Sequence, residues 1–222
     1  MKKSIGSKIG IGLLSLFIIV FVIYAIVQYF IFGPQTSPYI KEKQEIVKGF
    51  QYHPWIYILY IHIFFGIFAL ILGPFQFSKK LHQKKKELHR NIGKIYVFSI
   101  FIASMVGLYL SFYGTGGIVS VIGFYTLDIA WIITTLIGFL KIRKKEIQSH
   151  NEWMLRSYAV TFTFVTFRIW GMFALMISHE RGFLYGLTII FSWVLNILIA
   201  QWIILRSKKR IDIYNEIKTT VR

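Results

Sequence analysis

Two oppositely charged side chains, Arg168 and Asp128, interrupt long apolar stretches of this 222-residue sequence. Arg168 stands inside RSYAVTFTFVTFRIW, residues 156–170, and Asp128 is the only acidic residue within an apolar run. Either charge alone is costly in hydrocarbon, by roughly 2.5–3.5 kcal/mol on insertion scales. The simplest arrangement is an Arg168–Asp128 ion pair. Such a pair either clamps two helices together or belongs to a site for an anion, a quinone head group or a proton relay.

His62 and Tyr109 fall at a similar depth to these two charges. With a rise of about 1.5 Å per helical residue, Arg168 and Asp128 lie about 20 Å from the nearest basic ends of their runs. The same arithmetic brings His62 to that level when it is counted from the outer end of its run. Tyr109 reaches a similar level when it is counted from the basic end of its own run. A histidine there can bond to either charge and can change its own charge near neutral pH. We therefore expect a buried polar cluster of His62, Tyr109, Asp128 and Arg168.

Two further histidines, His89 and His150, could ligate a haem iron. Each opens an apolar run, and both are expected at the same membrane face. Gly93 follows His89 by four residues, on the same helix face, and would leave room for a porphyrin. Arg90 and Arg156 could bind the haem propionates. These five residues make a candidate site for haem b, although plain interfacial histidines would give the same pattern.

Other chemistry is sparsely represented. The sequence has no cysteine, so disulfides and thiolate metal sites are excluded, and no metal other than haem iron is predicted. Nucleophile-elbow, zinc-protease and phosphate-loop motifs do not occur. Whether the chain is an enzyme is left open. A lipid-active enzyme with His89, Arg90 and Arg156 facing head groups is one alternative.

Six apolar runs are long enough to position these residues across a membrane. Hydrophobic residues make up 55% of the chain, and a span needs about 20 of them in succession. The predicted spans are 9–33, 55–78, 92–113, 117–140, 153–177 and 183–205. We expect an all-α, six-helix transmembrane bundle, a single integral membrane domain over 1–222, in the cell membrane. Spans two to five should form its core, with the first and last at the periphery.

The distribution of basic residues predicts the orientation of this bundle. Of the 26 Lys and Arg residues, 21 lie in the two termini and in the segments 79–94 and 141–156. Only four lie in the alternate loops, so the positive-inside rule places both termini in the cytoplasm. The net charge of +17 is then explained by topology and by contact with anionic lipid head groups. Nucleic acid is not a predicted partner.

Two motifs resemble an uncharacterised family of bacterial predicted membrane proteins, a domain of unknown function. The first is LHRNIGKIYVFS, with His89, Arg90, Gly93 and Tyr96. The second is HNEWMLRSYAVTFTFVTFRIW, with His150, Trp153, Met154, Arg156, Ala159, Thr161 and Arg168. The likeness spans roughly 55–178 and implies a family without an activity.

A looser resemblance is to six-helix transmembrane b-type cytochromes. In these, helices 3 and 5 carry one histidine pair, which His89 and His150 match, and helices 2 and 4 carry the other. His62 matches helix 2, but helix 4 has Asp128 in place of a histidine. The resemblance implies haem at the cytoplasmic side. Three functions stay open: a haem-binding or redox-linked protein, a non-enzymatic protein for permeation, sensing or immunity, and a lipid-active enzyme.

Overall fold

The computed structural model describes residues 5–47, 49–178 and 182–220, and every regular element within them is helical. The helices are α1 (Ile5–Ile26), α2 (Pro38–Ile46), α3 (Tyr52–Gln76), α4 (Lys79–Lys84), α5 (Lys86–Ser111), α6 (Gly117–Arg143), α7 (Ile147–Thr161), α8 (Thr163–Ser178) and α9 (Phe183–Thr220). Between α1 and α2 lie a π-helical turn, η1 (Val27–Ile31), and a 3₁₀ turn, η2 (Pro34–Thr36).

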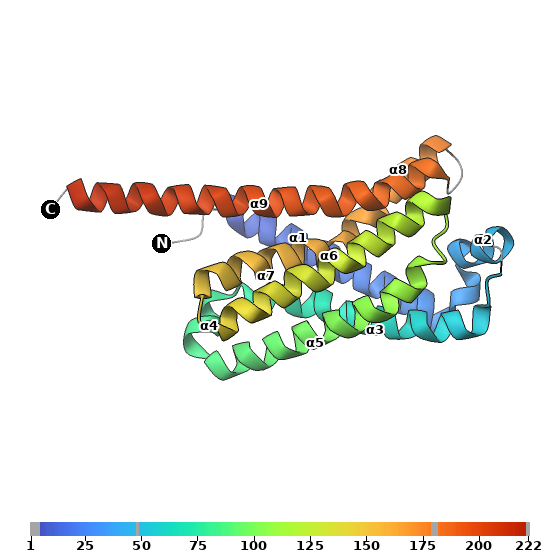
Figure 1. The fold of residues 1–222 in the computed structure, drawn as a ribbon, viewed down its shortest axis with the longest axis horizontal. Helices are drawn as coiled ribbons and strands as arrows, with labels where there is room; N and C mark the ends of the chain where they lie inside the picture. Colours follow the sequence, from blue (N-terminus) through green and yellow to red (C-terminus); the bar gives the residue numbers. More distant parts are fainter. Residues whose placement is uncertain (1–4, 48, 179–181, 221–222) are drawn as a thin grey trace.

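The long helices run side by side, with the basic segments gathered at one end (Figure 1). That end holds both termini, α4 and the connection between α6 and α7, whereas α2 covers the opposite end. We call these the basic end and the α2 end. The alternation of loops along the chain is the one that the charge pattern predicts.

Five helical segments are long and apolar enough to cross a membrane: Tyr52–Gln76, Lys86–Ser111, Gly117–Arg143, Ile147–Ser178 and Phe183–Arg210. They correspond to the second to sixth predicted spans. Several extend past the apolar runs, because helix formation does not stop where hydrophobicity does. In the first predicted span the apolar helical stretch, Ser15–Ile31, is shorter than the other five. A sixth crossing therefore stays a prediction.

Buried hydrogen bonds join α5, α6 and α7 at the centre of the bundle. The hydroxyl of Tyr96 lies 3.0 Å from that of Ser157 and 3.1 Å from that of Thr161. Trp131 donates its indole N–H to Thr161 over 2.8 Å, and Thr135 bonds to Ser157 over 2.7 Å. All five side chains are buried. Interhelical hydrogen bonds in membranes contribute about 0.6 kcal/mol each on average, so the network fixes register between three helices.

The sequence predicted that the last helix lies at the periphery, and this prediction was wrong. The polar side chain of Asn196 in α9 faces the neighbouring helices. Asn196 is buried and donates to the Ala159 carbonyl and to the hydroxyls of Thr163 and Thr166. These bonds attach α9 to α7 and α8. In α9 the polar amide of Asn196 thus makes interhelical bonds and does not face lipid.

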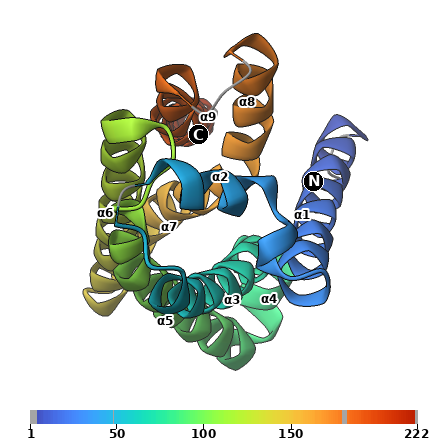
Figure 2. The ribbon, with the colours of Figure 1, turned by 90° about the vertical axis from the view of Figure 1, so that its right-hand side faces the viewer.

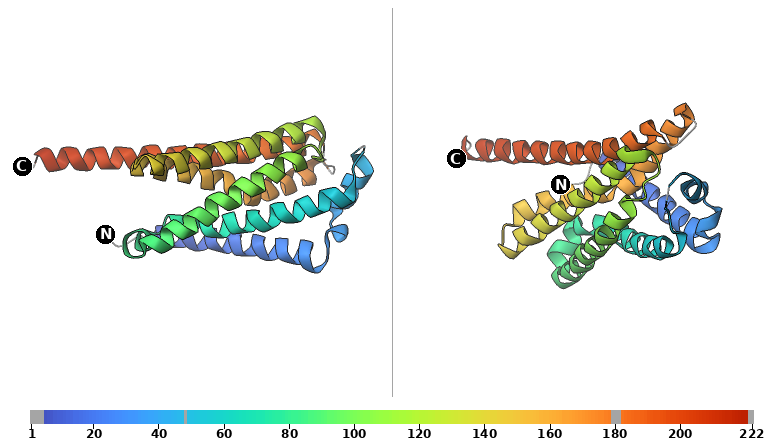
Figure 3. Two further views of the ribbon diagram at one scale, coloured as in Figure 1. Left: turned by 60° about the horizontal axis from the view of Figure 1, so that its bottom comes forward. Right: turned by 45° about the vertical axis from the view of Figure 1, so that its right-hand side comes forward.

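The first helix, by contrast, makes fewer contacts with the bundle, although Ile18 and Val22 belong to the core. In the end view, α3, α5, α6, α9 and α8 form an arc, and α1 lies at its open side, between α3 and α8 (Figure 2). The helix touches α3 and α8, but far less extensively than α3 touches α5. Figure 3 shows α1 running alongside α3 for much of its length. One side of the bundle is thus closed by a loosely packed helix.

The α2 end is closed by α2, which is anchored by a buried lysine. The side chain of Lys43 is fully buried, and its ammonium group donates to the carbonyl of Tyr113. It also lies 5.0 Å from the ring of Trp55 and 5.8 Å from that of Phe50. Cation–π contacts of this kind stabilise a desolvated ammonium group.

Candidate functional site

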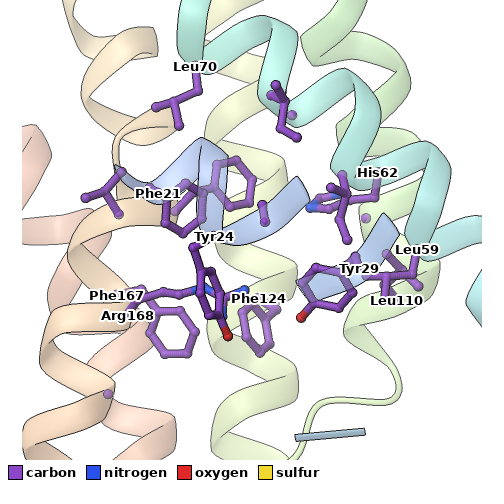
Figure 4. Close-up of a pocket in the computed structure, with 18 of the residues that line it drawn as sticks. Phe21, Tyr24, Tyr29, Leu59, His62, Leu70, Leu110, Phe124, Phe167 and Arg168 are labelled. Carbon is purple, nitrogen blue, oxygen red and sulfur yellow. The ribbon is translucent and has the colours of Figure 1, made fainter. Parts of the chain in front are cut away.

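A cavity of about 700 Å³ lies between α1 and the rest of the bundle. Its walls come from α1, α3, α5, α6 and α8, with Tyr29 of η1, Ser37 before α2 and Tyr185 of α9. Most lining side chains are aliphatic or aromatic, and Figure 4 shows several of them around the central space. The few polar groups on the lining therefore decide what this space can hold.

Arg168 of α8 is the cation on the cavity lining. Its guanidinium carbon lies 5.2 Å from the ring of Tyr24 and 5.4 Å from that of Phe21, both on α1. The hydroxyl of Tyr29 is a hydrogen-bonding partner. Figure 4 shows Tyr24 lying over Arg168. The charge is thus held by aromatic rings and a phenol from the first helix and the turn that follows it.

Asp128 of α6 also lines the cavity, but the predicted ion pair with Arg168 is not formed among the described residues. Its buried carboxylate accepts a hydrogen bond from Ser111 over 3.0 Å. It also lies over Gly107, where an added Cβ would be only 2.6 Å from Asp128 Oδ1. The missing side chain of Gly107 lets Asp128 turn toward α5, away from α8, which is the physical reason why the pair prediction was wrong.

His62 of α3 lies on the same lining, so the structure brings it together with Asp128 and Arg168. Its Nδ1 is 2.9 Å from the carbonyl of Ala103, which can only accept, so Nδ1 carries the proton. Tyr109 is not on this lining. Its ring packs 5.4 Å from that of Tyr113, in an aromatic cluster near the α2 end.

The structure gives no support for a haem between His89 and His150. The recess beside Gly93 is occupied by Gln76, whose Oε1 would be 3.2 Å from a Cβ there. Nδ1 of His150 lies 2.8 Å from the carbonyl of Gly138, a bond that holds α7 to α6. Gly93 is therefore a packing contact between α3 and α5, and no sequence pattern points to the side chain that fills its recess.

The two arginines that were predicted to bind the haem propionates, Arg156 and Arg90, lie in different environments. Arg156 donates to Gln201 of α9 over 2.7 Å and stacks on Trp153 at 4.6 Å. Arg90 is exposed on α5. Among the described residues, no three His, Cys, Asp or Glu side chains are grouped so that they could hold a metal ion. The structure therefore does not support a cofactor at this end.

Sequence reasoning missed the contribution of the first helix to the cavity. Tyr24 and Tyr29 are the tyrosines of that apolar run, and both line the cavity beside Arg168. A signal was present: Tyr24 is 16 residues after Lys8, a rise of about 24 Å, close to the depth of Arg168. Depth alone does not tell which way a side chain points, so the contact itself needed the structure.

The motif residues of α5 and α7 mostly hold helices together. Tyr96 bonds to Thr161, and the Ala159 carbonyl accepts from Asn196. Met154 packs on Gly138, with its sulfur 2.8 Å from where a Cβ would lie. Arg168 is the motif residue that lines the cavity.

Comparisons with curated proteins and with solved structures found no match. A family model described as "Predicted membrane protein (DUF2306)" matches residues 59–204, more than half of the chain. The match includes α5 to α8 and the cavity residues His62, Asp128 and Arg168, and it begins after α1. This multi-pass membrane protein therefore belongs to the DUF2306 family of predicted membrane proteins.

Proposed function

We propose that this protein is a non-enzymatic membrane protein that binds a lipid-soluble small molecule inside the bundle, as sensing or permeation requires. The cavity volume of about 700 Å³ falls within the roughly 300–1,000 Å³ typical of ligand pockets. Its largely apolar lining with a few polar groups is also typical of such pockets. A membrane supplies lipid-soluble molecules directly to such a site.

The observation that carries this proposal is the position of Arg168. A permanent cation is retained on an apolar cavity wall, although Asp128, the acidic residue on the same lining, does not neutralise it: the Asp128 carboxylate bonds to Ser111 instead. Intramembrane ionisable residues commonly mark ligand or ion pathways, because their cost must be offset by a role. A bound molecule with an oxygen acceptor would give the guanidinium a further partner besides the aromatic side chains of α1 and η1.

The loose attachment of α1 supports access from the side. This helix forms one wall of the cavity but makes few contacts with α3 and α8. A molecule dissolved in the bilayer could pass between α1 and α8 without crossing the α2 end. The proposal thus needs no water-filled path.

Gly66 offers a direct test, because it lines the cavity and nothing lies within 4 Å of a Cβ placed there. A leucine at this position should fill part of the cavity without disturbing the backbone. Gly12 of α1 is a matched control, since it also has open space around a Cβ but does not line the cavity.

Native mass spectrometry and solvent extraction of the purified protein would measure lipophilic molecules that co-purify with it. We expect bound molecules on the original chain and on Gly12→Leu, and a large loss on Gly66→Leu. Equal occupancy of all three proteins, or none on any of them after supplementation with membrane lipids, would contradict the proposal.

A further inference from the structure

The polar groups of the cavity differ in what they offer to a ligand. Arg168 presents a planar guanidinium with five N–H donors, a geometry that matches carboxylate and phosphate oxygens. Asp128 is only 4% exposed and its carboxylate is turned to Ser111 and Gly107. The charge that a ligand meets on this lining is therefore the positive one.

Aromatic groups from the first helix surround this charge. Tyr24 and Phe21 lie beside the guanidinium, and Tyr29 places its hydroxyl next to it. Tyr29 belongs to the π-helical turn η1, where Phe32 N bonds to Val27 O over 2.9 Å. Such wide turns within helices often occur at functional sites. The phenol of Tyr29 is a second donor for an oxygen bound at Arg168.

The rest of the lining suits one long apolar chain. Along α3 it extends from Trp55 to Leu70, and along α1 from Phe17 to the end of the helix. A rise of about 1.5 Å per residue makes this length roughly 20 Å along α3 and roughly 12 Å along α1. Beyond Arg168, toward the basic end, the lining includes Phe21, Phe17 and Leu70, all apolar. Figure 4 shows Leu70 and Arg168 at different heights in the cavity.

We infer that the ligand of this cavity is a single-chain amphiphile with one anionic carboxylate or phosphate head group. The head group binds Arg168 and the Tyr29 hydroxyl, and the chain occupies the apolar part toward Phe17 and Leu70. This inference rests on the proposed function and adds the chemical class of the ligand. Part of the specificity comes from α1 and η1, which lie outside the region that the family model matches.

Three probes of equal chain length separate the head group from the chain: palmitate, hexadecyl phosphate and hexadecanol. Their dissociation constants would be measured on the purified full-length protein in nanodiscs of a zwitterionic lipid. We expect both anionic probes to bind at least tenfold more tightly than the alcohol. Arg168→Gln should weaken the anionic probes by roughly 10- to 100-fold, the usual range for a lost hydrogen bond to a charged group, and leave hexadecanol nearly unchanged.

Two controls keep the result interpretable. Arg90→Gln removes an exposed arginine of α5 that is not on the cavity lining, and it should leave all three affinities unchanged. Tyr29→Phe keeps the ring and removes the hydroxyl, so it should weaken the anionic probes by about fivefold, even if Arg168→Gln does not fold.

The outcomes distinguish the inference from the proposed function. If hexadecanol binds as tightly as palmitate, and Arg168→Gln and Tyr29→Phe change neither affinity, the anionic class is wrong while the cavity still binds a lipophile. If palmitate and hexadecyl phosphate bind equally, the shared anionic chemistry is supported, and a difference identifies the preferred head group. If no probe binds, or Gly66→Leu binds all three as before, the proposed function fails with the inference.

Discussion

At the scale of single residues, Gly107 decides where the carboxylate of Asp128 goes. An alanine at this position would place its Cβ 2.6 Å from Asp128 Oδ1, inside the van der Waals distance, and would push the carboxylate away from Ser111. We expect Gly107→Ala to destabilise the protein by about 1–3 kcal/mol, as overpacked cores do. Thermal unfolding in detergent would measure it. Gly66→Ala, with open space around its Cβ, is the control that should lose no stability.

The second residue prediction concerns the charge of Asp128. A buried ion pair broken on one side costs roughly 3–5 kcal/mol in soluble proteins. Because Asp128 bonds to Ser111 and not to Arg168, Asp128→Asn keeps an oxygen acceptor for that hydroxyl. We therefore expect a change in unfolding free energy of less than about 1 kcal/mol, within the range of ordinary substitutions. A loss of stability as large as that of a broken ion pair would show that Arg168 depends on this carboxylate after all.

These residues also show what could and could not be predicted from the sequence. Helix rise gave the depth of His62, Asp128 and Arg168, and the structure has all three on one lining. Rise does not give the direction of a side chain around the helix axis. For that reason three features could not be predicted from the sequence. The Asp128 carboxylate points toward Gly107, Tyr109 does not line the cavity, and Gln76 fills the recess beside Gly93.

At the scale of elements, five of the long helices follow from runs of apolar residues alone. Which helices pack against one another does not follow from these runs. For example, the sequence does not tell whether Asn196 and Gln201 of α9 face lipid or protein. Loop positions were predictable, since charged residues or turns that contain glycine or proline end each apolar run. The closed packing of α9 and the separate position of α1 depend on side-chain contacts that no single helix encodes.

The prediction at this scale concerns the attachment of α7 to α5. Tyr96→Phe keeps the buried ring but removes the hydroxyl that bonds to Ser157 and Thr161. We expect a loss of about 1–2 kcal/mol, from about 0.6 kcal/mol per interhelical bond and the unsatisfied partners left behind. Tyr57→Phe, on an exposed ring of α3, is the matched control. Thermal unfolding of the two variants in one detergent would compare them, and equal stabilities would show that the network is dispensable.

At the scale of the whole molecule, the 21 basic residues predict which end faces the cytoplasm. A reporter enzyme fused to the C-terminus should be active only inside the cell, and one inserted between η1 and α2 only outside. The cavity would then lie in the outer half of the membrane, beneath α2. Activity of the C-terminal fusion outside the cell would reverse the orientation and move the cavity to the inner half.

The burial of Lys43 has a practical consequence for detecting movement of α2. Lys41, its neighbour on the same helix, is exposed, whereas Lys43 is shielded by Trp55, Phe50 and the Tyr113 backbone. An amine-acylating reagent that stays in water should therefore modify Lys41 rapidly and Lys43 only when α2 lifts from the bundle. The ratio of modified Lys43 to modified Lys41 in a mass spectrum would report how often this end opens. Exposed Lys41 serves as the internal reference for the rate of labelling.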